Sequence, residues 1–181
     1  VSNILTTEIA MGLLERPIKD ASYFKNFDQH VEVALQTGRE SIVLLKNDHV
    51  LPIDKNGEIS ILLTGEYADK IPHGGGAAEV VGYDHITMLT ALKEIYGDKV
   101  SYIEKPTDED LKAASHVIYS AGTFDSEGWD HPFDFSENMN NDIKHIASLN
   151  KNTIVSVSAG SGKNMTPWND DIAGLIYSWY P

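Results

Sequence analysis

The stretch Ile59-Ser60-Ile61-Leu62-Leu63-Thr64-Gly65 is a short run of mainly apolar, partly β-branched residues that ends at a glycine. It predicts a strand buried on both faces, because a strand with one face in water would alternate apolar and polar residues. Strands of this type are typical of parallel sheets covered by helices on each side. Further strands are predicted along the chain at 100–103, 116–122, 153–158 and 174–179.

Segments with helical spacing of apolar residues lie between these strands. Residues 30–46 predict one long helix, and residues 87–96 a second one that Thr87 caps and Gly97 ends. Two shorter helices are predicted at 108–114 and 138–149. Alternating strands and helices favour right-handed crossovers, so we predict an α/β fold. The predicted fold is a doubly wound, mainly parallel sheet with helices on both faces. It forms an α/β sandwich over residues 28–181.

Composition restricts the class of protein further. A length of 181 residues allows one domain, or one domain with part of a neighbour. The 27 acidic and 14 basic side chains give a formal net charge of −13, which argues against binding to nucleic acid or to anionic lipid. No apolar run reaches the roughly 18–20 residues that cross a bilayer, so we expect no membrane partner. The chain has no cysteine, which excludes disulfides and thiol nucleophiles and leaves the compartment unassigned.

Both ends of the sequence predict a segment of a longer polypeptide. Residues 1–14 have apolar residues at helical spacing and predict a helix with no partner beside it in sequence. Residues 17–27 show no period and are interpreted as a linker. The last predicted strand, 174–179, is followed only by Tyr180 and Pro181, with no polar tail. Association of the chain with itself is left open.

Three loops that follow predicted strands are unusual, and ligands of such sheets bind at the carboxyl ends of the strands. The first loop, His73-Gly74-Gly75-Gly76-Ala77-Ala78-Glu79, is either a ligand loop that brings backbone close to its ligand or a flexible surface loop. The second, residues 122–132, holds three carboxylates, a histidine and two aromatic residues. Like charges and aromatic faces raise the pKa of a carboxyl group, as a general acid requires, although such loops are commonly solvated turns.

The third loop, Ala159-Gly160-Ser161-Gly162-Lys163-Asn164, resembles a phosphate-binding motif only in part. The first glycine of that motif is replaced by Val157 and its Ser/Thr by Asn164, so we reject an ATP site. The histidines show no metal-ligand spacing, and we expect neither a metal nor a cofactor. Trp179 and Tyr180 are interpreted as packing groups rather than as a platform for a sugar.

Several stretches, in the same order along the chain, resemble glycoside hydrolase family 3, whose best-known members are β-glucosidases. The matching stretches are Gly38–Asn47 with Leu51-Pro52-Ile53 (A-R-E-S-I-V-L-L-K-N…L-P-L), Gly74–Val80 (G-G-G-S-A-x-V), Ser126–His131 (S-E-G-x-D-R), Asn150–Val155 (N-x-N-T-V-V) and Trp179-Tyr180-Pro181 (W-Y-P-G-Q). Ala77 stands in place of a common serine, and His131 in place of a common arginine.

The resemblance implies a two-domain enzyme in which a (β/α)8-type barrel precedes an α/β sandwich and a β-glucoside or oligosaccharide binds between them. Residues 1–16 resemble the closing helix of that barrel. The resemblance further implies a retaining mechanism, with an aspartate nucleophile on the barrel and Glu127 as catalytic acid/base. Residues that we expect to contact the sugar are Gly75, Gly76, Ala77, Asp125 and Trp129.

The predicted function is therefore part of a retaining β-glucosidase-like exo-glycosidase that hydrolyses terminal non-reducing β-D-glucosyl residues. A β-xylosidase or broad β-glycosidase of the same family stays open, because the residues that select the sugar are expected mostly on the barrel. A non-catalytic carbohydrate-binding module is a rival of another class, against which the motif around Glu127 argues. A flavodoxin-like nucleotide-binding module lacks its phosphate fingerprint.

Overall fold

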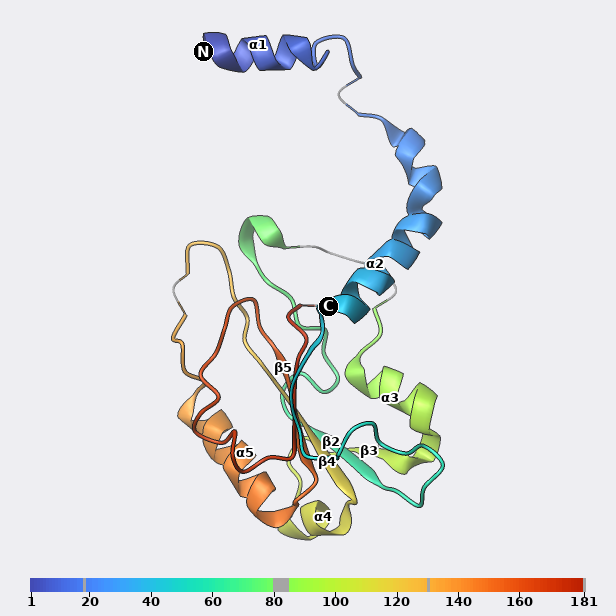
Figure 1. Ribbon diagram of the computed structural model, residues 1–181, viewed down its shortest axis with the longest axis vertical. Coiled ribbons are helices and arrows are strands. Elements are labelled where there is room, and N and C mark those ends of the chain that lie inside the picture. The colour runs from blue at the N-terminus through green and yellow to red at the C-terminus, as the bar shows by residue number, and fades with distance from the viewer. Residues whose placement is uncertain (18, 80–84, 130, 181) are drawn as a thin grey trace. The chain divides into compact units, whose positions relative to one another are not determined.

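The computed structural model describes residues 1–181 except 18, 80–84, 130 and 181 (Figure 1). The chain forms two units, Val1–Arg39 and Glu40–Pro181. The first contains α1 (Ser2–Ala10), the 3-10 helix η1 (Ala21–Asn26) and most of α2 (Phe27–Ser41). Helix α1 buries no residue, and its Ile4 and Ile9 side chains are exposed. None of the described helices is both long and apolar enough to cross a membrane.

The second unit is a six-stranded sheet with helices on both faces. Its strands are β1 (Val43–Asn47), β2 (Ile61–Thr64), β3 (Val100–Tyr102), β4 (His116–Gly122), β5 (Thr153–Ser158) and β6 (Gly174–Tyr177). Its helices are η2 (Gly76–Ala78), α3 (Met88–Tyr96), η3 (Gly97–Lys99), α4 (Asp108–Ala113) and α5 (Glu137–Leu149). The predicted α/β fold is confirmed.

The sheet is parallel except at one edge. Its order is β1-β6-β5-β4-β2-β3, in which β1 pairs antiparallel with β6 and all other pairs are parallel. From β2 the chain runs outward to β3 and then returns to β4 on the other side of β2, so the direction of winding reverses between β2 and β4. The carboxyl ends of the parallel strands all lie along the same side of the sheet, which we call its carboxyl edge. The loops predicted to form the site begin there.

The strand β1 corrects one sequence prediction. Residues 30–46 were expected to form a single helix, but α2 ends at Ser41 and Val43–Asn47 form a strand. Backbone pairing of Val43 with Tyr177, and of Leu44 with Ile176, overrides the helical spacing. The apolar residues of 42–45 fit either period, and the partner strand is more than 120 residues away in sequence, which is why the local pattern misled.

Two apolar clusters cover the two faces of the sheet, because side chains alternate along each strand. Leu62 and Tyr119 face α4 and α5, whereas Ile61, Leu63 and Ile118 face α3. Figure 1 shows α5 and α3 on opposite sides of the strands. Thr87 caps α3 by accepting a hydrogen bond from the Thr90 backbone, and Gly97 ends it, as the sequence predicted.

A buried asparagine joins α4 to β5. The Asn150 side-chain amide donates hydrogen bonds to the carbonyls of Leu111 and Ala114, at 2.9 and 2.7 Å, at the end of α4. Its side-chain oxygen accepts from the Asn152 backbone at 2.9 Å. Since only 7% of Asn150 is exposed, water cannot readily replace these bonds.

We therefore predict that Asn150→Leu lowers the free energy of unfolding by about 2–4 kcal/mol, because two carbonyls lose their donor in a buried place. Urea denaturation of the chain measures this change. The matched control is Asn141→Leu, an exposed position on α5, where the change should stay within about 0.5 kcal/mol. Equal effects of the two substitutions would contradict the structural role of Asn150.

Candidate active site

Two of the loops singled out from the sequence meet at the carboxyl edge of the sheet. The Gly75 backbone donates a hydrogen bond to the Asp125 carbonyl at 2.9 Å, and Gly75 forms an isolated parallel bridge with Ser126. The loop after β2 therefore lies along the loop after β4. This contact brings the predicted sugar-binding residues Gly75 and Gly76 next to the predicted acid/base Glu127.

Glycine is needed at both of these positions. A Cβ atom on Gly75 would lie 2.5 Å from the Phe124 ring. Gly76 has a φ of +72°, and a Cβ there would lie 3.0 Å from Ser126 Oγ and 3.5 Å from Glu127 Cβ. The glycine loop is thus packed against the Glu127 loop, which distinguishes it from a loop that is free in solvent.

Glu127 is exposed and precedes Gly128, whose φ is +78°. Its carboxylate makes no hydrogen bond or ion pair within the part of the chain that the structure describes. The aromatic residues expected to limit its solvation pack elsewhere: Phe124 lies edge-on to His73 at 5.5 Å, and Trp129 is 67% exposed and tilted toward His131 at 6.0 Å. Glu127 is therefore free to meet a group from outside the chain.

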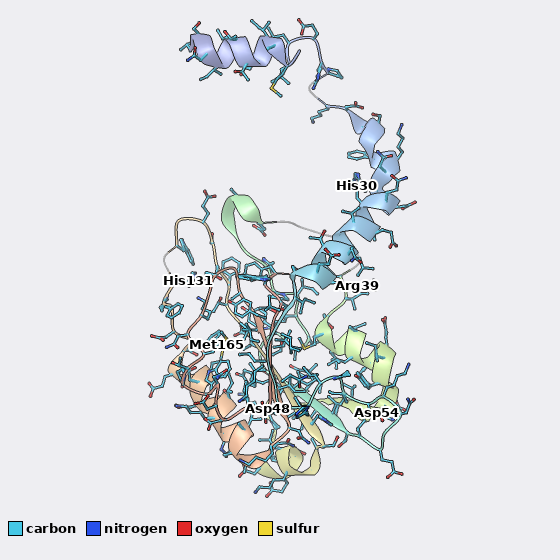
Figure 2. The ribbon with its side chains drawn as sticks, viewed as in Figure 1. His30, Arg39, Asp48, Asp54, His131 and Met165 are labelled. Atoms are coloured by element: carbon cyan, nitrogen blue, oxygen red, sulfur yellow. The ribbon has the colours of Figure 1, made fainter. Side chains whose placement is uncertain are left out.

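Of the other residues predicted to contact the sugar, some lie on the surface and one lies in the interior. Ala77 is exposed in η2, and Trp129 is exposed two residues after Glu127. Asp130, which the sequence placed among the like charges around Glu127, lies outside the described residues. Figure 2 shows His131 on the long loop after β4, at the end of the domain opposite α4.

The Asp125 carboxylate lies in the interior of the loop cluster. Its Oδ2 accepts hydrogen bonds from the Gly160 backbone at 2.7 Å, from the Tyr180 hydroxyl at 3.0 Å and from the Thr123 hydroxyl at 3.1 Å. The Tyr180 hydroxyl oxygen also accepts from the Asp125 backbone at 2.9 Å. One carboxylate oxygen therefore joins the loop after β4, the loop after β5 and the residue Tyr180 beyond β6.

A buried lysine completes this network. Lys163 Nζ lies 3.6 Å from Asp125 Oδ1 and donates to the Pro132 carbonyl at 3.2 Å. Only 1% of the Lys163 side chain is exposed. A lysine is rarely buried so completely without a partner of opposite charge, and Asp125 provides that charge. We call Asp125, Lys163, Tyr180, Thr123 and Gly160 the Asp125 network.

Burial alone would raise the pKa of Asp125, but the hydrogen bonds from Gly160 and Tyr180 and the charge of Lys163 outweigh it and lower the pKa below its ordinary value of 3.8. Burial and the charge of Asp125 also raise the pKa of Tyr177 to about 12. At neutral pH the Asp125 carboxylate is therefore ionised, with three hydrogen bonds at Oδ2 and the Lys163 ammonium group 3.6 Å from Oδ1.

The sequence did not single out Lys163 or Tyr180 as parts of this site. Lys163 was considered only within a rejected phosphate motif, and Tyr180 was interpreted as a packing group. No local pattern pointed to their contact with Asp125, because the three residues lie in different segments of the chain. Among the described residues, no group of three or more histidines and carboxylates could hold a metal ion.

Residues 42–181 match the family model described as the glycosyl hydrolase family 3 C-terminal domain, so the chain belongs to this family and contains that domain. The resemblance inferred from the motifs is confirmed. The relatives that the chain matches carry the names of glycoside hydrolases.

The chain is 32% identical over 194 residues to thermostable β-glucosidase B of Acetivibrio thermocellus, which covers 92% of this chain and 24% of that protein. It is 27% identical to probable β-D-xylosidase 6 of Arabidopsis thaliana, over 99% of this chain and 26% of that one. A crystal structure of a β-glucosidase from Listeria innocua in complex with glucose shares the fold, with a TM-score of 0.79 and 23% identity over 98% of this chain and 27% of that one. The chain spans about a quarter of the length of these relatives.

The Asp125 network makes a prediction about stability and pH. A carboxyl group whose pKa is lowered by folding stabilises the folded state above its ordinary pKa, and this contribution is lost as the pH falls through the folded pKa. Asp125→Asn should therefore lower the free energy of unfolding by about 2–3 kcal/mol near pH 7, and by clearly less near pH 2.

Urea denaturation at several pH values measures this difference between variant and wild type. The control is Asp171→Asn, which changes an exposed carboxylate and should have little effect at any pH. A deficit of Asp125→Asn that did not depend on pH would mean that the ionised carboxylate is not what stabilises the loops.

Proposed function

We propose that this chain supplies the general acid/base, Glu127, of a retaining β-glucosidase-like exo-glycosidase that removes terminal non-reducing β-D-glucosyl residues. The observation that carries the proposal is the packing of Gly75 and Gly76 against Ser126 and Glu127 at the carboxyl edge of the sheet. This packing leaves the Glu127 carboxylate exposed beside a glycine loop that allows close approach of a substrate.

In the proposed reaction, Glu127 first donates its proton to the glycosidic oxygen while a second carboxylate attacks the anomeric carbon. The bond to the leaving group breaks, and a glycosyl-enzyme forms. Glu127, now ionised, then takes a proton from a water molecule that attacks the anomeric carbon and releases the sugar. The second carboxylate is proposed to lie on a barrel domain that precedes this chain.

The remaining candidate residues fall into two roles. The exposed residues Ala77 and Trp129, together with the backbone of Gly75 and Gly76, are proposed to contact the sugar. Asp125 was expected to be a sugar contact as well, but its two carboxylate oxygens lie within the Asp125 network. We assign it to positioning the loop that carries Glu127.

A β-xylosidase or broad β-glycosidase is the second candidate, and the relative from Arabidopsis thaliana supports keeping it. Initial rates of the complete polypeptide on nitrophenyl β-glucoside and nitrophenyl β-xyloside distinguish the two. The proposal predicts the larger kcat/KM for the glucoside. A preference for the xyloside would replace the proposed substrate and leave the role of Glu127 intact.

The role of Glu127 predicts that Glu127→Ala in the complete polypeptide lowers kcat/KM on cellobiose by about 10²–10⁴, because glucose is a poor leaving group that needs a proton. On dinitrophenyl β-glucoside the first step should survive and release of the sugar should slow. Glu109→Ala, which removes an exposed glutamate from α4, is the matched control and should retain activity.

Azide provides the decisive part of this experiment, since it attacks the glycosyl-enzyme without a general base. In Glu127→Ala it should accelerate turnover of the dinitrophenyl substrate and give the β-glycosyl azide. Wild-type activity of Glu127→Ala on cellobiose, or no acceleration by azide, would remove Glu127 from the mechanism.

The 181-residue chain by itself should not hydrolyse glycosides. Retaining hydrolysis needs two carboxyl groups roughly 5–5.5 Å apart, and the nearest acidic neighbour of Glu127 in sequence, Asp125, is engaged in its own network. Purified chain incubated with nitrophenyl β-glucoside should release no nitrophenol above the level of a Glu127→Ala preparation. Turnover that Glu127→Ala abolished would show that the chain carries its own nucleophile.

A further inference from the structure

A cavity of about 600 Å3 opens on the face of the sheet that α5 covers. It is lined by the end of β2 at Thr64, by Glu66 and Glu104 from the loops after β2 and β3, by Tyr119 of β4 and by Asp142 of α5. None of its lining residues lies within 73–79 or 122–132, the two segments that meet at Glu127. Its volume lies within the range of small-molecule sites in proteins.

The position of this cavity follows from the topology. The connection after β2 leads to β3 on one side, whereas the connection after β4 leads to β5 on the other side, so the two connections run away from each other between β2 and β4. In open α/β sheets such a reversal forms a crevice at the carboxyl ends of the strands, where ligands bind. The cavity adjoins the ends of β2 and β3 and is lined by Tyr119 of β4.

Tyr119 is the observation that points to a ligand. The residue is only 6% exposed and lines the cavity, and its hydroxyl makes no hydrogen bond with any residue that the structure describes. Burial, with the charges of Asp142 and Glu66, raises its pKa to about 12, so the hydroxyl stays protonated and both carboxylates lie near it. A protonated tyrosine hydroxyl on the wall of a cavity can both donate a hydrogen bond to a ligand and accept one from it.

The lining combines an apolar floor with a polar rim. Leu111 and Ile146 are 1% and 4% exposed and form the floor with the half-buried Met139 and Pro106. The rim is made of exposed charged and polar side chains, namely Glu66, Lys70, Glu104, Lys105, Ser136, Asn138, Asp142 and His145. Such a surface suits a compact molecule with apolar faces and hydroxyl groups at its edge.

The charges on the rim disfavour other classes of ligand. Lys70 lies 3.9 Å from Glu66, so its positive charge already has an acidic neighbour. A phosphate would face three carboxylates with two lysines, which is unfavourable. Within the described residues, no set of side chains meets the requirements of a metal ion.

We propose that this cavity binds a neutral carbohydrate, a mono- or disaccharide, through hydrogen bonds of its hydroxyl groups with Tyr119, Glu66 and Asp142. The site adds a second place for carbohydrate on the domain, beyond the proposed function of Glu127. The sugar ring packs on the apolar floor, and the Tyr119 hydroxyl gains the partner that it lacks.

Titration of the isotope-labelled chain with cellobiose, followed by NMR, tests the proposal. The backbone signals of Gly65 and Glu104 at the cavity should shift with a saturable dependence on cellobiose. Tyr119→Phe, which removes only the hydroxyl, should weaken this binding by about three- to tenfold, and Asp142→Asn should weaken it too. Tyr96→Phe is the matched control: its hydroxyl donates to the Ile53 carbonyl outside the cavity, so binding should be unchanged.

Three outcomes would overturn the proposal: no shift at the cavity with cellobiose, an unchanged affinity in both Tyr119→Phe and Asp142→Asn, or shifts there with inorganic phosphate or spermidine instead of cellobiose. The signals of Gly75 and Gly128 report on the Glu127 loops in the same titration. Failure at the cavity is thereby distinguished from failure of the proposed active site, which hydrolysis by the complete polypeptide tests separately.

Discussion

The Asp125 carboxylate is the point on which the arrangement of the candidate active site depends. It accepts hydrogen bonds from Gly160 and Tyr180 and faces the buried ammonium group of Lys163. A charge held in such a place is stabilising only while all of its partners remain, so the loops that provide them are fixed together. The charge and hydrogen bonds of Asp125 therefore hold the loops after β4 and β5 in a fixed arrangement.

Asp125 and Glu127 lie in one short loop but in different surroundings. The two carboxylates are separated only by Ser126, yet the first is engaged in the interior and the second is exposed. The glycine loop joins them, because Gly75 pairs with Ser126 and bonds to the Asp125 carbonyl. The Asp125 network thus fixes the loop at Asp125 and leaves the Glu127 carboxylate accessible. The proposed proton transfer to a substrate requires such access.

The sequence predicted most of the sheet, because the buried parallel strands are encoded locally. The runs at 116–122 and 153–158 are strands with the expected bounds, and Thr87 and Gly97 delimit α3. The strand Val43–Asn47 was missed, since its pairing with β6 is a property of the tertiary structure. The prediction of Glu127 rests on a motif within one loop, whereas the ion pair of Lys163 with Asp125 joins residues from different loops. No local pattern records that contact.

The central claim is that this domain holds the Glu127 carboxyl where a substrate bound at the carboxyl edge of the sheet can receive its proton. A crystal structure of the complete polypeptide with sulfur-linked cellobiose, which resists hydrolysis, tests it most directly. The account predicts the Glu127 carboxyl against the interglycosidic atom, on the side opposite a second carboxylate, with the Asp125 network unchanged. A complex in which another carboxyl group occupies that position while Glu127 faces solvent would contradict it.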